Sequence, residues 1–142
     1  MNAHVAVQRP GAETPGYAPH APLDALASRY VKVDDLEWTS AGSPGMDWKI
    51  LFQDKERGLM TALVRFQPGA ELDLHRHVDI EQTYVLEGSL DDAEGICEAG
   101  DFVWRPKDNC HRAVAPNGAL LLAIFQTPNV FLEGPRAGKP LR

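Results

Sequence analysis

Four side chains of metal-ligand type lie in two short segments of the sequence. His75, His77 and Glu81 are spaced by two and four residues, and His111 follows in the second segment. Alternate residues of a β-strand point to the same face, so His75 and His77 would project together, and Glu81 shares their parity. Neutral imidazoles and a carboxylate together suit a divalent transition metal. We therefore predict that these four residues form a mononuclear metal site.

A series of short β-strands has to position these side chains. Segments rich in β-branched and aromatic residues are separated by turn residues about every 8 to 12 positions, and no long helical period occurs. This pattern predicts an all-β sandwich or barrel. The expected strands are 29–33, 36–38, 48–53, 59–66, 70–77, 82–88, 96–98, 100–106, 110–114 and 119–127.

The chain has 142 residues, which suits one domain with a real core. Residues 1–28 are rich in Pro, Ala and Gly, and we expect an arm that is disordered or packed on a partner subunit. Residues 23–30 could form one or two helical turns. The barrel is expected over 29–134, and a short tail over 135–142.

The composition excludes several classes of protein. A net charge of −6 argues against a nucleic-acid binder, and no apolar run approaches the length of a membrane span. The N-terminus lacks the pattern of a secretory signal. The two cysteines, Cys97 and Cys110, are not spaced as a zinc finger or a redox pair, so we expect a reduced, cytoplasmic protein. Cys110 has opposite parity to His111, which predicts a buried structural thiol facing away from the metal.

Several other side chains are assigned structural roles. The acidic turn 91–94 is too short and too exposed in character for a calcium loop. His4 and His20 lie in the arm and are expected to be solvated. The aromatic residues expected in the core, or lining an apolar pocket above the metal, are Phe66, Phe102, Trp104 and Phe125.

Both segments resemble the conserved motifs of the cupin superfamily. The first fits G-x5-HxH-x3-E-x6-G, at Gly69, His75, His77, Glu81 and Gly88. The second resembles G-x5-P-x-G-x2-H-x3-N, at Gly100, Pro106 and His111. Asp108 stands where that motif has Gly, and Ala115 stands where it has Asn; neither is a ligand position. The resemblance implies a single-domain double-stranded β-helix, the jelly-roll barrel of cupins, and a homodimer.

Within the cupins, residues 75–125 resemble the ChrR-like group. That group contains the cupin half of ChrR-type zinc anti-sigma factors and small iron dioxygenases that cleave acetylacetone or 2,4'-dihydroxyacetophenone. The resemblance implies a non-haem Fe(II) dioxygenase that uses O2 to cleave a C–C bond of a β-diketone or hydroxyketone. Iron would be held by the three histidines, with or without Glu81. Zn, Mn, Ni or Co would also suit these ligands.

Two alternatives to the dioxygenase stay open. The first is a non-catalytic metal or ligand sensor like the cupin half of ChrR. The absence of cysteine from residues 1–45 weakens it, because no second zinc-binding domain is present there. The second is an isomerase or epimerase, in which a histidine acts as a base, and the presence of all four ligand-type residues argues against that.

Overall fold

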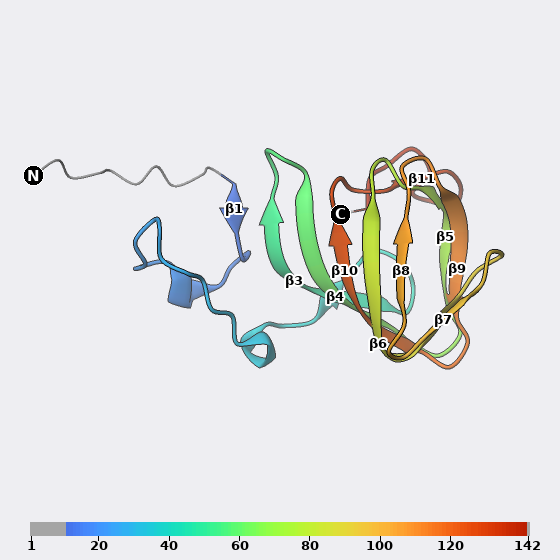
Figure 1. The fold of residues 1–142 in the computed structure, drawn as a ribbon, viewed down its shortest axis with the longest axis horizontal. Coiled ribbons are helices and arrows are strands. Elements are labelled where there is room, and N and C mark those ends of the chain that lie inside the picture. The colour runs from blue at the N-terminus through green and yellow to red at the C-terminus, as the bar shows by residue number, and fades with distance from the viewer. Residues whose placement is uncertain (1–10, 142) are drawn as a thin grey trace, which may run out of the picture.

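The computed structural model describes residues 11–141, and almost all of its regular structure is β (Figure 1). Residues 1–10 of the predicted arm, including His4, and residue 142 of the predicted tail lie outside the described residues. No helix among the described residues is long and apolar enough to cross a membrane. The strands are β1 (Ala12–Glu13), β2 (Thr39–Ser40), β3 (Met46–Asp54), β4 (Leu59–Phe66), β5 (Ala70–Arg76), β6 (Glu81–Asp91), β7 (Ile96–Glu98), β8 (Phe102–Arg105), β9 (Cys110–Ala115), β10 (Ala119–Phe125) and β11 (Val130–Phe131). The two 3-10 helices are η1 (Ala18–His20) and η2 (Val33–Asp35).

Strand β6 joins the two walls of a curled antiparallel sheet. Its residues 81–84 pair with β8, and its paired positions over 81–88 lie against β10, in the wall that continues through β4 and β3. Its last residues, 89–91, pair with β7, and Asp91 pairs with β9, in the wall that continues through β5 to β11. The sheet therefore folds over along β6 and encloses a core, as the two walls in Figure 1 show. The predicted all-β, single-domain jelly-roll barrel is confirmed.

Alternation of buried and partly exposed residues along the strands builds this core. In β4, the buried residues Met60, Val64 and Phe66 alternate with partly exposed ones. Strand β10 follows the same pattern, and its buried Phe125 is the direct strand partner of Met60. The predicted core positions of Phe66 and Phe125 are confirmed.

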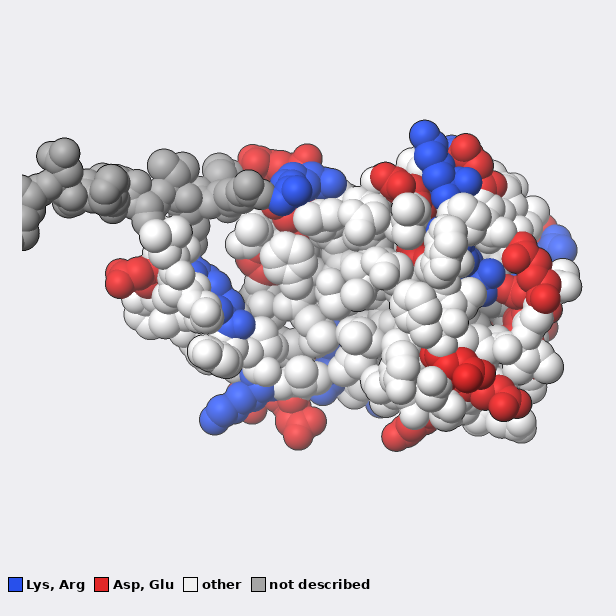
Figure 2. All heavy atoms as spheres, viewed as in Figure 1, with Lys and Arg blue, Asp and Glu red and all other residues white. Residues whose placement is uncertain are grey.

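The predicted core positions of Phe102 and Trp104 are wrong. These side chains are 54% and 58% exposed, because the inward positions of β8 belong to Val103 and Arg105. The aromatic pair thus lies on the outer face of the barrel. Figure 2 shows that the face over β6, β8 and β10 is largely uncharged, with charged side chains toward its margins.

The predicted strands at 29–33 and 36–38 are absent from the described structure. The 3-10 helix η2 lies between them, and the Val33 carbonyl accepts a hydrogen bond from Lys49 Nζ at 2.9 Å. The strand that pairs with the start of β3 is β2, and neither 29–33 nor 36–38 pairs there. Residues 23–30 form a hydrogen-bonded turn, from Ala27 N–H to the Asp24 carbonyl, and no helix.

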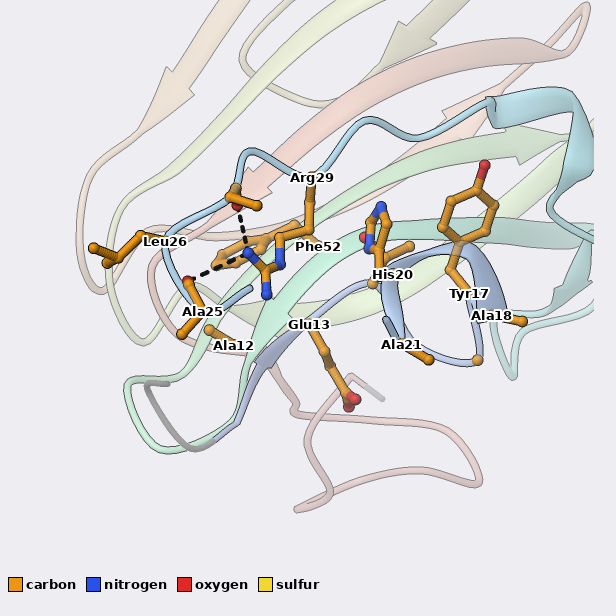
Figure 3. Close-up of a pocket in the computed structure, with 13 residues that line it drawn as sticks. Ala12, Glu13, Tyr17, Ala18, His20, Ala21, Ala25, Leu26, Arg29 and Phe52 are labelled. Carbon is orange, nitrogen blue, oxygen red and sulfur yellow. Dashed lines mark hydrogen bonds between the residues drawn. The ribbon is translucent and has the colours of Figure 1, made fainter. Parts of the chain in front are cut away.

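The described part of the arm curves away from the barrel after β1 pairs with β3. A hollow of about 860 Å³ lies beneath it, lined by arm residues and by Phe52 of β3 (Figure 3). The Arg29 guanidinium faces the hollow but donates hydrogen bonds to the arm's own carbonyls, at Asp24 and Ala25. None of the four predicted metal ligands lines this hollow.

Residues with positive φ lie both within a strand, as at Gly88 of β6, and in a turn, as at Asp108 before β9. Gly88 has a φ of 71°, and a Cβ atom at this position would lie only 2.0 Å from the Gly118 carbonyl oxygen. Asp108 is the sole non-glycine residue with positive φ among residues 11–141, at 70°. It occupies the motif position at which cupins have Gly, so the turn keeps the left-handed geometry despite the different residue.

Candidate metal centre

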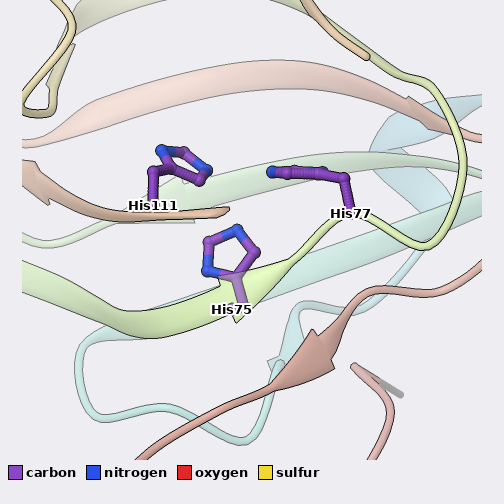
Figure 4. A group of neighbouring side chains, drawn as sticks. All are labelled: His75, His77 and His111. Carbon is purple, nitrogen blue, oxygen red and sulfur yellow. The ribbon is translucent and has the colours of Figure 1, made fainter. Parts of the chain in front are cut away.

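Three of the four predicted ligands converge inside the barrel. His75 lies on β5 and His111 on β9, and the two are direct partners across the strand pair. His77 follows the end of β5. One ring nitrogen from each lies within 4.8 Å of those of the other two, and the side chains point toward one another (Figure 4). All three are buried, at 1%, 0% and 7% exposure for His75, His77 and His111.

Backbone hydrogen bonds hold His77 in place although its strand has ended. Its N–H donates to the Asn109 carbonyl at 2.9 Å, and its carbonyl accepts from Asp108 N–H at 2.7 Å. The turn before β9 therefore continues the pairing of β5 by one residue. This arrangement preserves the side-chain parity that the HxH spacing predicts.

The Nδ1 atoms of His75 and His111 both face acceptors. His75 Nδ1 lies 2.8 Å from the Asp73 carbonyl oxygen, and His111 Nδ1 lies 2.9 Å from Asp92 Oδ2. A carbonyl or an ionised carboxylate can only accept, so Nδ1 carries the proton in each ring. The lone pair of each neutral imidazole is then on Nε2, which is the nitrogen available to a metal.

His77 has the same arrangement with Glu81. Its Nδ1 lies 2.8 Å from Glu81 Oε2, although the two groups are not aligned as a linear hydrogen bond. Its Nε2 is buried and has no hydrogen-bond partner among the described residues. A buried polar nitrogen without a partner is destabilising unless a ligand satisfies it. The residues present thus fit a metal ion held by three Nε2 atoms.

The fourth predicted ligand, Glu81, lies beside the three-histidine group and is not a member of it. Its Oε2 also accepts from Asn129 Nδ2 at 2.9 Å, and its Oε1 accepts from the Thr83 hydroxyl at 3.2 Å. Burial raises the pKa of Glu81, but the contacts with His77 and Asn129 outweigh it and lower the pKa to about 2. Glu81 is therefore an ionised carboxylate whose oxygens already contact protein groups.

Sequence reasoning missed two residues of the site, Asp92 and Arg105. The Asp92 side chain is 4% exposed, so the expectation of an exposed acidic turn is wrong for this residue. Its Oδ1 accepts from the N–H groups of Glu94 and Gly95, which fixes the turn. Its Oδ2 contacts His111 and also Arg105, whose guanidinium lies 2.7 Å away. The Asp-rich turn was visible in the sequence, but the burial of its side chain was not.

Burial favours the neutral form of two imidazoles. It is the largest cause of the lowered pKa of His111, which falls to about 3, and neighbouring His75 and Arg105 lower it further. The pKa of His75 is lowered mainly by burial as well, against the hydrogen bond to Asp73. Neutral imidazole is the form that binds a metal, so neither ring has to lose a proton near neutral pH.

The predicted burial of Cys110 is wrong. Cys110 is exposed, and its thiol lies 3.5 Å from the Asp108 carbonyl oxygen. It occupies the face of β9 opposite to His111, as its parity predicts, but that face meets solvent at this end of the strand. Cys97 on β7 is the buried cysteine of the chain, and burial raises the pKa of its thiol.

His75 and His111, but not His77, line a small cavity of about 30 Å³. A single water molecule needs roughly 10 to 15 Å³ of such space. The cavity could therefore hold a metal ion with one or two small ligands. Its polar lining residues are His75, His111, Glu81, Thr83 and Arg105, and the remaining lining residues are apolar.

The barrel and its three-histidine centre define a cupin that could bind a metal ion. Residues 26–129 match the family described as the ChrR cupin-like domain, and the chain belongs to that family. Among curated proteins, no sequence matches this chain significantly.

Solved structures show the same fold. A candidate acetylacetone dioxygenase of Methylibium petroleiphilum PM1 aligns at 23% identity and a TM-score of 0.70, covering 82% of this chain and 88% of that one. The acetylacetone dioxygenase of Acinetobacter johnsonii aligns at 20% identity and a TM-score of 0.70, covering 82% of this chain and 84% of that one. A chain from the complex of Rhodobacter sphaeroides SigE with the anti-sigma factor ChrR aligns at 25% identity and a TM-score of 0.58, covering 66% of this chain and 51% of that one.

Proposed function

We propose that this protein is a mononuclear non-haem Fe(II) dioxygenase that cleaves a C–C bond of a small β-diketone or hydroxyketone. The observation that carries the proposal is the convergence of three buried imidazoles with each Nδ1 beside an acceptor. Three nitrogen ligands leave three sites of an octahedral ion free, and Glu81 would orient His77 rather than bind. Bound there, iron would act as a Lewis acid and bring an enolised substrate and O2 together.

The surrounding residues would exclude water and position the substrate. Apolar side chains such as Phe66, Leu121 and Phe125 line the cavity and would keep solvent from the reacting atoms. A second recess of about 220 Å³, lined by Met60 and Trp48, lies beside them. Met60, which lines the recess, is the strand partner of Phe125, which lines the cavity, so the two hollows lie on neighbouring strands. The apolar part of a substrate would occupy the recess.

Oxygen uptake tests the reaction. The protein is purified without added metal, reloaded anaerobically with Fe(II), and mixed with acetylacetone or hydroxyacetophenones while dissolved O2 is recorded. We expect substrate-dependent O2 consumption by the wild type and none by H111A, the matched control that loses a ligand. An iron-loaded wild type that consumes no O2 with any diketone or hydroxyketone would contradict the proposal.

A metal or ligand sensor is the second candidate function. The family match and the small size of the cavity support it, because about 30 Å³ admits an ion with one or two small ligands but no larger substrate without rearrangement. Such a protein would retain tightly bound zinc through purification and show no oxygen uptake. Metal analysis of the purified protein, before any reloading, separates the two candidates.

We also propose a homodimer. The exposed side chains of Phe102 and Trp104, on a largely uncharged face, support an interface there. Light scattering coupled to size-exclusion chromatography measures the mass directly, and a monomer would contradict this proposal.

A further inference from the structure

Among residues 11–141, Arg105 is the only Lys or Arg whose side chain lines the cavity beside His75 and His111. It is the last residue of β8, and it is 7% exposed. Its backbone lies opposite Glu81 in the register of β6 and β8, but its guanidinium reaches Asp92 in the turn after β6. Because β6 passes from one wall of the barrel to the other between these two points, Arg105 extends across the interior.

Asp92 satisfies only part of the Arg105 guanidinium. The contact is with one oxygen, Oδ2, and that oxygen also accepts from His111. Asp92 is the only ion-pair partner of Arg105 among residues 11–141. A guanidinium has five N–H donors in a planar fork that matches carboxylate oxygens. Donors therefore remain for a ligand that enters the cavity.

The formal charges of the site leave a positive excess. The buried carboxylates of Glu81 and Asp92 carry two negative charges, and Arg105 carries one positive charge. A divalent metal at the histidines would add two more, which leaves one uncompensated positive charge. An unbalanced charge in a low-dielectric interior is unfavourable, and a monoanion would cancel it. Without Arg105 the same site would be neutral and would gain nothing from an anion.

We propose that Arg105 is a positioning residue that makes this cavity selective for small monoanions with oxygen donors, a carboxylate or an enolate, bound between the metal and the guanidinium. The inference rests on the proposed metal site and narrows its ligand class. A merely structural alternative is that Arg105 holds Asp92, and through it His111, so that its loss would weaken metal binding instead.

Formate binding to the Co(II)-loaded protein separates these roles. Formate is a monoanion small enough for the cavity, and its binding is followed in the visible absorption of Co(II). The variants are R105Q, which removes the charge, and R105K, which keeps it; Co(II) content is measured first for each. We expect full Co(II) in all three proteins, at least a tenfold weaker formate affinity in R105Q, and an affinity in R105K within about threefold of the wild type.

Four results would overturn the proposal. If R105Q binds formate as tightly as the wild type, Arg105 does not select anions. If R105Q and R105K both lose Co(II), the structural role is correct. If the wild type binds Co(II) but not formate, the proposed anion site is contradicted and the proposed metal site is not. If the wild type binds no Co(II), the proposed metal function is contradicted as well.

Discussion

His77 Nδ1 and Glu81 Oε2 lie 2.8 Å apart, so the carboxylate contacts one histidine of the three-histidine group and is not itself part of that group. Glu81 is also fixed by Asn129 and Thr83. Carboxylates in this position set the tautomer and orientation of a metal-binding histidine. This relationship gives Glu81 an indirect role in the proposed site.

The E81Q variant tests that role. Because glutamine keeps the shape but removes the charge, we expect E81Q to retain a bound metal with an affinity about 10 to 100 times weaker than that of the wild type. Competition against a chromophoric chelator measures the affinity. Complete loss of the metal, equal to the loss in H111A, would instead make Glu81 a direct ligand.

Removal of the Asp92 charge has two expected effects. In D92N, the buried guanidinium of Arg105 loses its ion-pair partner, and His111 loses its anionic acceptor. We expect the free energy of unfolding to fall by about 3 kcal/mol and the metal affinity to fall as well. Urea unfolding of the metal-free protein measures the first effect. The matched control is E94Q, which changes an exposed carboxylate in the same turn whose side-chain partner is Asn109. We expect E94Q to change stability and metal affinity little. Equal effects in D92N and E94Q would refute the role of Asp92.

The metal-free protein is expected to lose stability as the pH falls from 7 to 5. The pKa values of His75 and His111 are lowered in the folded state, so between about pH 6.5 and the folded values the unfolded chain binds more protons. Stability therefore falls with decreasing pH, by roughly 1 kcal/mol per pH unit for His111, and His75 changes it in the same direction. Glu81 titrates below this window, because its folded pKa is about 2.

Urea unfolding at a series of pH values measures this slope. The matched variant H111N should show a shallower slope between pH 6.5 and 5, since one of the buried imidazoles is gone. If H111N and the wild type show the same slope, His111 does not cause the loss of stability at low pH.

The left-handed backbone conformation of Asp108 predicts that its glycine and asparagine variants are more stable than its alanine variant. Glycine adopts a φ of 70° without strain and asparagine tolerates it, whereas alanine does not. We expect D108A to lower the free energy of unfolding by about 1 kcal/mol, and D108G and D108N to remain within about 0.5 kcal/mol of the wild type. The R76A variant controls for loss of the exposed ion pair with Asp108. D108A and D108G of equal stability would contradict the strain argument.

The histidines could be predicted from the sequence because they depend on local rules. Strand parity and the HxH spacing were sufficient for His75 and His77, and the second motif located His111. Side chains alternate on β8 as well, but the expectation that its two large aromatic residues mark the buried face was wrong. Phe102 and Trp104 lie outside, and the inward position belongs to the charged Arg105.

The groups that support the histidines depend on tertiary contacts instead. Asp92 reaches His111 across 19 residues of sequence, and Asn129 reaches Glu81 across 48. Asn129 directly precedes β11, a strand of only two residues that carries no periodic signal. Such partners are identified by the fold and not by spacing, which is why the ligand set was predictable and the network behind it was not.

Metal content of the single histidine variants tests the central claim most directly. The wild type, H75A, H77A and H111A are loaded with Fe(II) under anaerobic conditions, desalted and analysed, with circular dichroism to verify folding. The control is H20A, because His20 lies on the arm, where its ring contacts Tyr17 and the Tyr30 carbonyl and none of the three histidines. We predict about one metal ion per chain in the wild type and in H20A, and almost none in the other three variants. A folded H111A with the metal content of the wild type, or a wild type that binds no metal, would contradict the account.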